Sequence, residues 1–153
     1  MTIAETDATL RPAGGPGLEY LRRIQRGLVP PVPAAGLLGL RVVEADPGRV
    51  VLELEASGRY GNPRHVHGGI LAAVADFGVS AAVLTVVGDG QEVVTADLHV
   101  SYLRAVALDA GTLTCTGLVV HVGRTQANAT VELAAGGRTL VRASGTCRIL
   151  GPR

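Results

Sequence analysis

The pattern of apolar and polar residues changes its period along the chain. Near the front, Leu18, Leu21 and Ile24 recur at helical spacing and are followed by the breaker VPPVP, which predicts a short amphipathic helix. Two strand-like runs, LGLRVVEAD and RVVLELEA, are then joined by the turn signal DPG and predict a β-hairpin. A short helix and a hairpin therefore open the predicted fold.

The longest apolar run covers residues 65–90 and reads HVHGGILAAVADFGVSAAVLTVVGDG. Its length and its many Ala and Leu residues favour a helix over a strand. The two glycines give this helix an N-terminus with free backbone amides, and GDG ends it. One carboxylate, Asp76, stands in the middle of the run. Because a charged side chain is seldom buried without a partner, its position calls for a functional explanation.

The rest of the chain alternates with a period of two. In TADLHVSY the pattern assigns Thr95 and Asp97 to one face and Ala96 and Leu98 to the other, and QANATVEL repeats the alternation. Such a period predicts strands with one wet face. TLTCTGLVVH and RTLVRASGTCRI predict two more strands, and AAGGRT predicts a hairpin turn.

The predicted order is thus a short helix, two strands, a long helix and four strands. An all-apolar helix and one half-buried antiparallel sheet must cover each other. We therefore expect an α+β domain of the hotdog fold, in which a curved antiparallel sheet of about six strands wraps a long central helix. Residues 1–16, rich in Thr, Ala, Pro and Gly, are expected to form a mobile N-terminal tail. Residues 17–153 are expected to form a single domain.

Composition narrows the possible functions. The 153 residues are 47% hydrophobic and 18% charged, an ordinary globular balance. The basic residues are all Arg and are scattered along the chain, which argues against a nucleic-acid surface. Cys115 and Cys147 lie within predicted strands and are interpreted as small buried hydrophobic residues. The histidines share no ligand spacing, so we expect no metal site.

No membrane or export signal is predicted. The start lacks a basic region followed by an apolar one, so a cytoplasmic location is the default expectation. Residues 70–87 are long enough to be considered as a span, but Asp76 and Gly78 interrupt them. A central helix wrapped by a sheet explains the same apolarity better.

Several stretches resemble one family. HGGILAAVADFG resembles the helix motif of the hotdog-fold acyl-CoA thioesterases, in particular the phenylacetate-pathway (PaaI-like) type. TADLHVSYLRA is similar to that family's strand after the helix, and HVGRTQANATVELAAGGRTLVRASGTCRIL is similar to its closing pair of strands. The likeness spans residues 36–150. It implies an enzyme that hydrolyses an aryl, arylacetyl or medium-chain acyl-CoA and needs no cofactor beyond the coenzyme A of its substrate.

The resemblance also implies roles for individual residues of the helix. Asp76 matches the catalytic acid, acting as general base or as nucleophile, and Gly68 matches the oxyanion donor. Free amides at the positive end of a helix suit a developing oxyanion, and Gly69 is a second candidate donor. Ser80 falls where the family often has a hydroxyl that holds the acid or water, although it could equally bond its own helix. His67 could touch the substrate or simply cap the helix.

Two further residues come from the resemblance alone. Asn62 is the counterpart of a substrate-binding residue, although its loop, NPRHVHGG, is one residue shorter than in the family and carries His65. Arg124, in VGRT, resembles a position near the nucleotide of coenzyme A, and guanidinium groups are natural partners of phosphate.

The spacing of the two main candidates predicts an assembly. Gly68 and Asp76 are eight residues apart, which is about 12 Å along one helix. Groups that act on one carbonyl must come within about 3 to 3.5 Å of it. We therefore expect a homodimer, or a dimer of such dimers, in which Gly68 of one subunit faces Asp76 of the other.

Other functions of the same fold remain as alternatives. A hotdog hydratase or dehydratase would act on an enoyl or 3-hydroxyacyl thioester with a catalytic His. A regulatory protein could bind acyl-CoA without turnover and would not need Asp76. A plain assembly module explains neither the glycines nor the acid. The acyl group and the choice between coenzyme A and an acyl-carrier protein stay open at this point.

Overall fold

The computed structural model describes residues 17–152, so the tail predicted for residues 1–16 lies outside the described residues. The elements in chain order are α2 (Gly17–Gln25), α3 (Pro33–Leu38), β1 (Arg41–Asp46), β2 (Arg49–Glu55), the 3₁₀ helix η1 (Gly58–Tyr60), α4 (Gly68–Leu84), β3 (Glu92–Tyr102), β4 (Thr112–Val122), β5 (Gln126–Ala135) and β6 (Arg138–Leu150). The predicted short helix, hairpin, long helix and four further strands are all confirmed.

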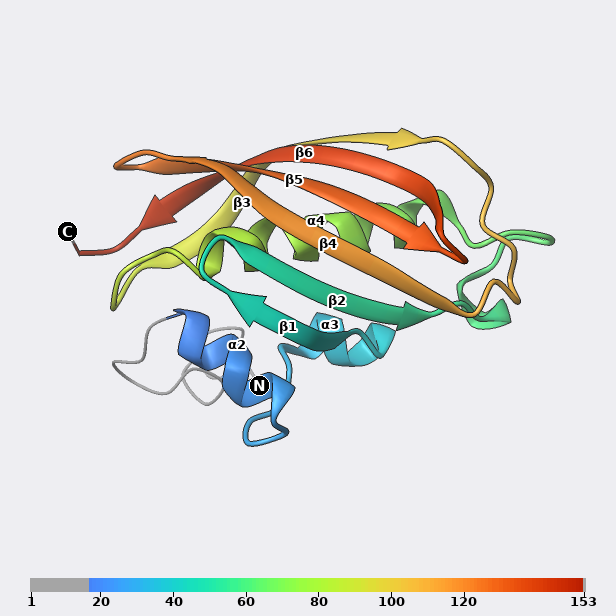
Figure 1. Ribbon diagram of the computed structural model, residues 1–153, viewed down its shortest axis with the longest axis horizontal. Helices are drawn as coiled ribbons and strands as arrows, with labels where there is room; N and C mark the ends of the chain where they lie inside the picture. Colours follow the sequence, from blue (N-terminus) through green and yellow to red (C-terminus); the bar gives the residue numbers. More distant parts are fainter. Residues whose placement is uncertain (1–16, 153) are drawn as a thin grey trace.

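The six strands form one antiparallel sheet in the order β1-β2-β4-β5-β6-β3. The sheet curves over one side of α4, while α2 and α3 lie beside the β1 and β2 end (Figure 1). This is the predicted hotdog fold. The order leaves β1 and β3 as the two edge strands of the sheet.

The core lies between the sheet and one face of α4. Residues such as Leu71, Val74 and Val79 on this face are buried. Glycine allows the close approach at Gly78, because an added Cβ would stand 2.7 Å from Sγ of Cys115 on β4. The opposite face of α4 is left half-covered by the subunit. That open face carries Asp76.

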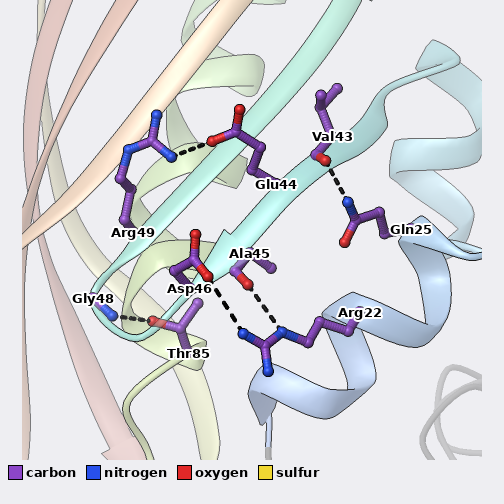
Figure 2. A network of polar contacts seen from close by, with 9 residues as sticks. All are labelled: Arg22, Gln25, Val43, Glu44, Ala45, Asp46, Gly48, Arg49 and Thr85. Atoms are coloured by element: carbon purple, nitrogen blue, oxygen red, sulfur yellow. Dashed lines mark hydrogen bonds and ion pairs between the residues drawn. The ribbon is translucent and has the colours of Figure 1, made fainter.

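The edge of β1 is closed by side chains of α2 (Figure 2). Nε of Arg22 donates to the Ala45 carbonyl at 3.1 Å, and Nε2 of Gln25 donates to the Val43 carbonyl. Arg22 also pairs with Asp46 at 3.3 Å. Unpaired edge strands are sites for strand addition, so these contacts block one of the two edges.

The structure corrects the predicted faces at the start of β3. Its pairing with β6 shifts register between Thr95 and Asp97, so Ala96 is an extra, exposed residue. Thr95 pairs with the buried Cys147 and therefore lies on the inner face, whereas Asp97 is exposed. A bulge inserts one residue and reverses the alternation on one side of it, which a strict period of two does not anticipate.

A second difference from the predicted fold is the helix α3, which begins at the last residue of VPPVP, the run interpreted as a helix breaker. Proline is well tolerated in the first helical turn because its fixed φ suits the helix and because an N–H at that position would have no acceptor within the helix. α3 accordingly begins at Pro33 and ends at Leu38, where Gly39, whose φ is 72°, caps it. The apolar residue Ala35 joins α3 to the core.

Both cysteines are free and fully buried, as predicted. Burial raises the pKa of the Cys115 thiol from 9.0 to about 12, and this thiol lies 3.6 Å from the Val74 carbonyl of α4. Within residues 17–152 no helix has the length and apolarity needed to cross a membrane.

Candidate active site

The loop before α4 is a tight, internally bonded turn. Oδ1 of Asn62 accepts hydrogen bonds from the amides of His65, at 3.0 Å, and Arg64, at 3.4 Å. The ends of the turn pair with each other through Gly61 and Val66. The Asn62 side chain therefore shapes the loop, and such local bonding is a common use of Asn in turns.

At the N-terminus of α4, one backbone amide has no hydrogen-bond acceptor among the described residues. Nδ1 of His67, the N-cap, accepts from the Gly69 amide at 2.9 Å. The His67 carbonyl accepts from the amides of Ile70 at 2.9 Å and Leu71 at 3.3 Å. Among the described residues no acceptor is bonded to the Gly68 amide. Of the two glycines proposed as donors, Gly68 is thus the one whose N–H is available.

Asp76 has a carboxylate oxygen without a partner. Its Oδ1 is buried and receives no hydrogen bond from residues 17–152. Its neighbour one turn later, Ser80, donates to the Phe77 carbonyl at 3.3 Å, which matches the alternative in which Ser80 bonds its own helix. A buried carboxylate oxygen that has no hydrogen bond is available to accept one from a water molecule or a ligand.

The charge of Asp76 acts on Cys147 of β6. The pKa of the Cys147 thiol is raised, chiefly by burial and further by the negative charges of Asp76 and Asp97. A hydrogen bond from Thr95 opposes this effect. The thiol is therefore held neutral.

The subunit keeps the two main candidates apart. α4 is unbroken from Gly68 to Leu84, so Gly68 and Asp76 are separated by about 12 Å along the helix axis at 1.5 Å per residue. One subunit alone cannot place both groups on one carbonyl.

Arg124 lies beyond the C-terminal end of α4, at the end of the helix away from Gly68. With Val86, Val87 and Gln91 it lines a pocket of about 300 Å³ beyond the C-terminus of α4. The Arg124 side chain is exposed, so its charge is free to meet a ligand. Within one subunit, this pocket and Gly68 are at opposite ends of α4.

One residue near Gly68 was missed by the sequence pattern. The hydroxyl of Tyr102, the last residue of β3, donates to the Gly68 carbonyl at 2.9 Å. Alternation places Tyr102 on the inner face of a strand, but nothing in the sequence says that the strand ends beside the helix N-terminus.

The fold and the site together define a class of protein. A six-stranded antiparallel sheet that wraps one long helix is the hotdog fold, and within residues 17–152 this helix has a free N-terminal amide and a mid-helix carboxylate oxygen without a hydrogen bond. The sequence profile of the Thioesterase superfamily matches residues 64–142, and the chain belongs to that superfamily. It is therefore a thioester hydrolase, and the predicted resemblance is confirmed.

Solved structures agree with this assignment. The chain is 30% identical to AziG of S. sahachiroi, with a TM-score of 0.75 and coverage of 78% of this chain and 98% of AziG. It is also 30% identical to a phenylacetic acid degradation-related protein of Ralstonia eutropha, with a TM-score of 0.76 and coverage of 84% and 98%. PaaI of E. coli, at 23% identity, a TM-score of 0.73 and coverage of 86% and 94%, shares the fold. A comparison with curated proteins gave no match.

Proposed function

We propose that this chain hydrolyses an acyl-CoA thioester at a site shared between two subunits. The proposal rests on two groups of α4 that have no hydrogen-bond partner among the described residues, the Gly68 amide and Oδ1 of Asp76. They have the chemistry of an oxyanion donor and a base, but they are too far apart to act together within one subunit. A second subunit related by a twofold axis supplies the missing half.

The symmetry of such a pair locates its centre. If two antiparallel copies of α4 bring Gly68 opposite Asp76 of the partner subunit, the twofold axis passes at the level of Ala72, midway between them. The neighbouring residues on the open side of the helix are Gly69 and Ala73. Small side chains at the centre allow the two helix backbones to approach closely.

The open edge of the sheet supports the same pairing. The β1 edge is blocked by α2, whereas β3 presents an 11-residue edge. Val94, near the start of β3, and Leu103, directly after its last residue, are each 50% exposed. An edge of this kind readily adds another strand, and antiparallel pairing of two β3 strands satisfies the same twofold axis. A dimer of such dimers would use other surfaces.

In the proposed reaction, the thioester oxygen accepts a hydrogen bond from the Gly68 amide of one subunit. Asp76 of the partner subunit removes a proton from water, whose oxygen attacks the carbonyl carbon. The tetrahedral intermediate collapses as the C–S bond breaks, and the proton passes to the leaving thiolate of coenzyme A. Direct attack by Asp76 would instead give a mixed anhydride that water then hydrolyses.

The antiparallel arrangement also places Arg124 on the outer side of the site, away from the twofold axis. Leu84, the last residue of α4, is eight residues past Asp76 and would lie about 12 Å beyond the level of the partner's Gly68, so the pocket lined by Arg124 would lie further out along the coenzyme A than the thioester. A guanidinium group there suits the phosphates of coenzyme A. An arylacetyl group is favoured by the similarity to the phenylacetic acid degradation-related protein of Ralstonia eutropha, with other aryl and medium-chain acyl groups as further substrates. No other cofactor enters the reaction.

The first experiment is free-thiol release from a panel of arylacetyl-, aryl- and fatty acyl-CoA thioesters. The shared site is then tested by mixing two inactive variants, Gly68→Pro, which deletes the amide hydrogen, and Asp76→Asn. When equal amounts of the two variants are unfolded and refolded together, about half of the dimers should be heterodimers. Each heterodimer has one intact site of two, so activity should return to roughly a quarter of that of the wild type.

Mixtures that stay inactive, although heterodimers form, would contradict a shared site. Turnover that survives Asp76→Asn in the pure variant would contradict the role of the acid. Tight binding of every acyl-CoA without thiol release by the wild type would replace hydrolysis with a binding function.

A further inference from the structure

The catalytic amide proposed at Gly68 lies in a segment with little intrinsic rigidity. Gly68 and Gly69 open the helix, and glycine has the largest conformational freedom of any residue. The N–H of an oxyanion donor must nevertheless have a fixed orientation before the reaction, because reorientation during the reaction reduces the stabilisation that it gives to the transition state. Contacts from outside the helix must therefore supply this rigidity.

Two such contacts act on residues next to Gly68. The His67 amide donates to the Tyr60 carbonyl at 2.9 Å, and the His67 ring accepts from Gly69. They fix the residue before Gly68 and the residue after it. Neither contact reaches an atom of Gly68 itself.

Tyr102 makes the contact with Gly68. Its hydroxyl donates to the Gly68 carbonyl at 2.9 Å. Two ring carbons of Tyr102 lie 3.4 Å from the position that a Cβ on Gly68 would occupy, so the ring rests against the glycine. Tyr102 is 51% exposed, and a side chain this exposed adds little to the core.

We propose that Tyr102 is a positioning residue that fixes the direction of the Gly68 amide toward the thioester oxygen. The hydrogen bond restrains the carbonyl of Gly68, and the ring occupies the side of the glycine on which a Cβ would project, so rotation of this residue is limited from two directions. The N–H of Gly68 then points in one direction. This inference rests on the proposed function.

The test compares two matched deletions of a hydroxyl group. Tyr102→Phe removes the bond to Gly68 and keeps the ring. Thr146→Val keeps the side-chain shape and removes a similar bond, in which the Thr146 hydroxyl on β6 accepts from Nδ2 of Asn128 on β5 at 2.9 Å. For Tyr102→Phe we expect kcat to fall about 3- to 10-fold, the equivalent of one ordinary hydrogen bond, with KM and the thermal midpoint unchanged. For Thr146→Val we expect a lower midpoint and an unchanged kcat.

A second readout does not depend on turnover. The ¹⁵N order parameter of the Gly68 amide should fall in Tyr102→Phe from the rigid value of about 0.85 toward about 0.6, and it should stay unchanged in Thr146→Val. An unchanged order parameter, or a lower one with an unchanged kcat, overturns the role of Tyr102. A wild type without thioesterase activity overturns the proposed function instead, and the order parameter alone then decides whether Tyr102 holds Gly68.

Discussion

Replacing Gly68 with proline should make the protein more stable and almost inactive. Gly68 is the first residue of α4, and proline is favoured at that position. His67 has φ −62° and ψ 134°, the extended conformation that a residue before proline prefers. The amide hydrogen that proline removes has no acceptor among the described residues. The substitution therefore deletes the proposed oxyanion donor without removing a bond that supports the fold.

The magnitudes follow from these contacts. Restricting the unfolded chain at a compatible position should raise the free energy of unfolding by about 0.4 to 1 kcal/mol. Loss of one oxyanion donor should lower kcat about 100- to 1,000-fold. Gly69→Pro should instead destabilise the protein, because the Gly69 amide donates to the His67 ring and because proline disfavours a helical residue before it.

Chemical denaturation and thiol release measure the two effects. Gly68→Ala is the control for bulk, because it keeps the N–H and its Cβ would stand 3.4 Å from the Tyr102 ring, an ordinary contact. If Gly68→Pro retains a kcat within about threefold of Gly68→Ala, a smaller change than loss of one oxyanion donor produces, the reasoning about the free amide is wrong.

Three further predictions follow from the same structure. Asp76→Ala should abolish thiol release and yet raise the denaturation midpoint, since it removes a buried oxygen without a partner, a feature that costs about 1 to 3 kcal/mol. An unchanged or lower midpoint would count against that cost. Gly78→Ala should destabilise by about 1 to 3 kcal/mol through overpacking, because its Cβ would stand 2.7 Å from Cys115; Gly36→Ala, with its nearest contact at 3.5 Å, should be neutral or stabilising in the same melts. The pKa of Cys115, raised from 9.0 to about 12, favours the folded state below pH 9; this stability should be lost at about 1.4 kcal/mol per pH unit as the pH rises through that interval. Denaturation at several pH values should show the loss in the wild type and a smaller slope in Cys115→Ala.

The sequence predicted the elements whose side chains alternate or recur regularly. β5 is an example, since its inward residues Ala127 and Leu133 are buried as the period of two requires. The pattern failed where one residue changes the geometry, as at the bulge beside Ala96 and at Pro33, which begins a helix. Local pattern carries no information on such places, because the bulge is set by pairing with β6 and α3 by packing on the core.

The candidate site divides in the same way. The free amide of Gly68 and the lone carboxylate of Asp76 were both visible in the sequence, because they belong to one predicted helix; their catalytic roles, which the family resemblance implies, stay a prediction. The capping bond of His67 was named only as an alternative, since a ring nitrogen can bond a backbone amide or a ligand. Tyr102 could not be found, because its contact joins positions 34 residues apart. Chain topology alone brings the end of β3 to the start of α4.

The composition of α4 is a separate argument for a second subunit. A helix that is apolar on all sides is normally buried on all sides. The sheet covers only one face of α4, and the other face, with Ala72, Ala73 and Asp76, remains half-buried in the chain. In the proposed dimer the partner's helix covers this face between Gly68 and Asp76, and the lone carboxylate meets the thioester that is held by the partner's Gly68. The feature that made Asp76 unusual in the sequence, an acid within an apolar run, is then what a helix shared between a core and an intersubunit active site requires.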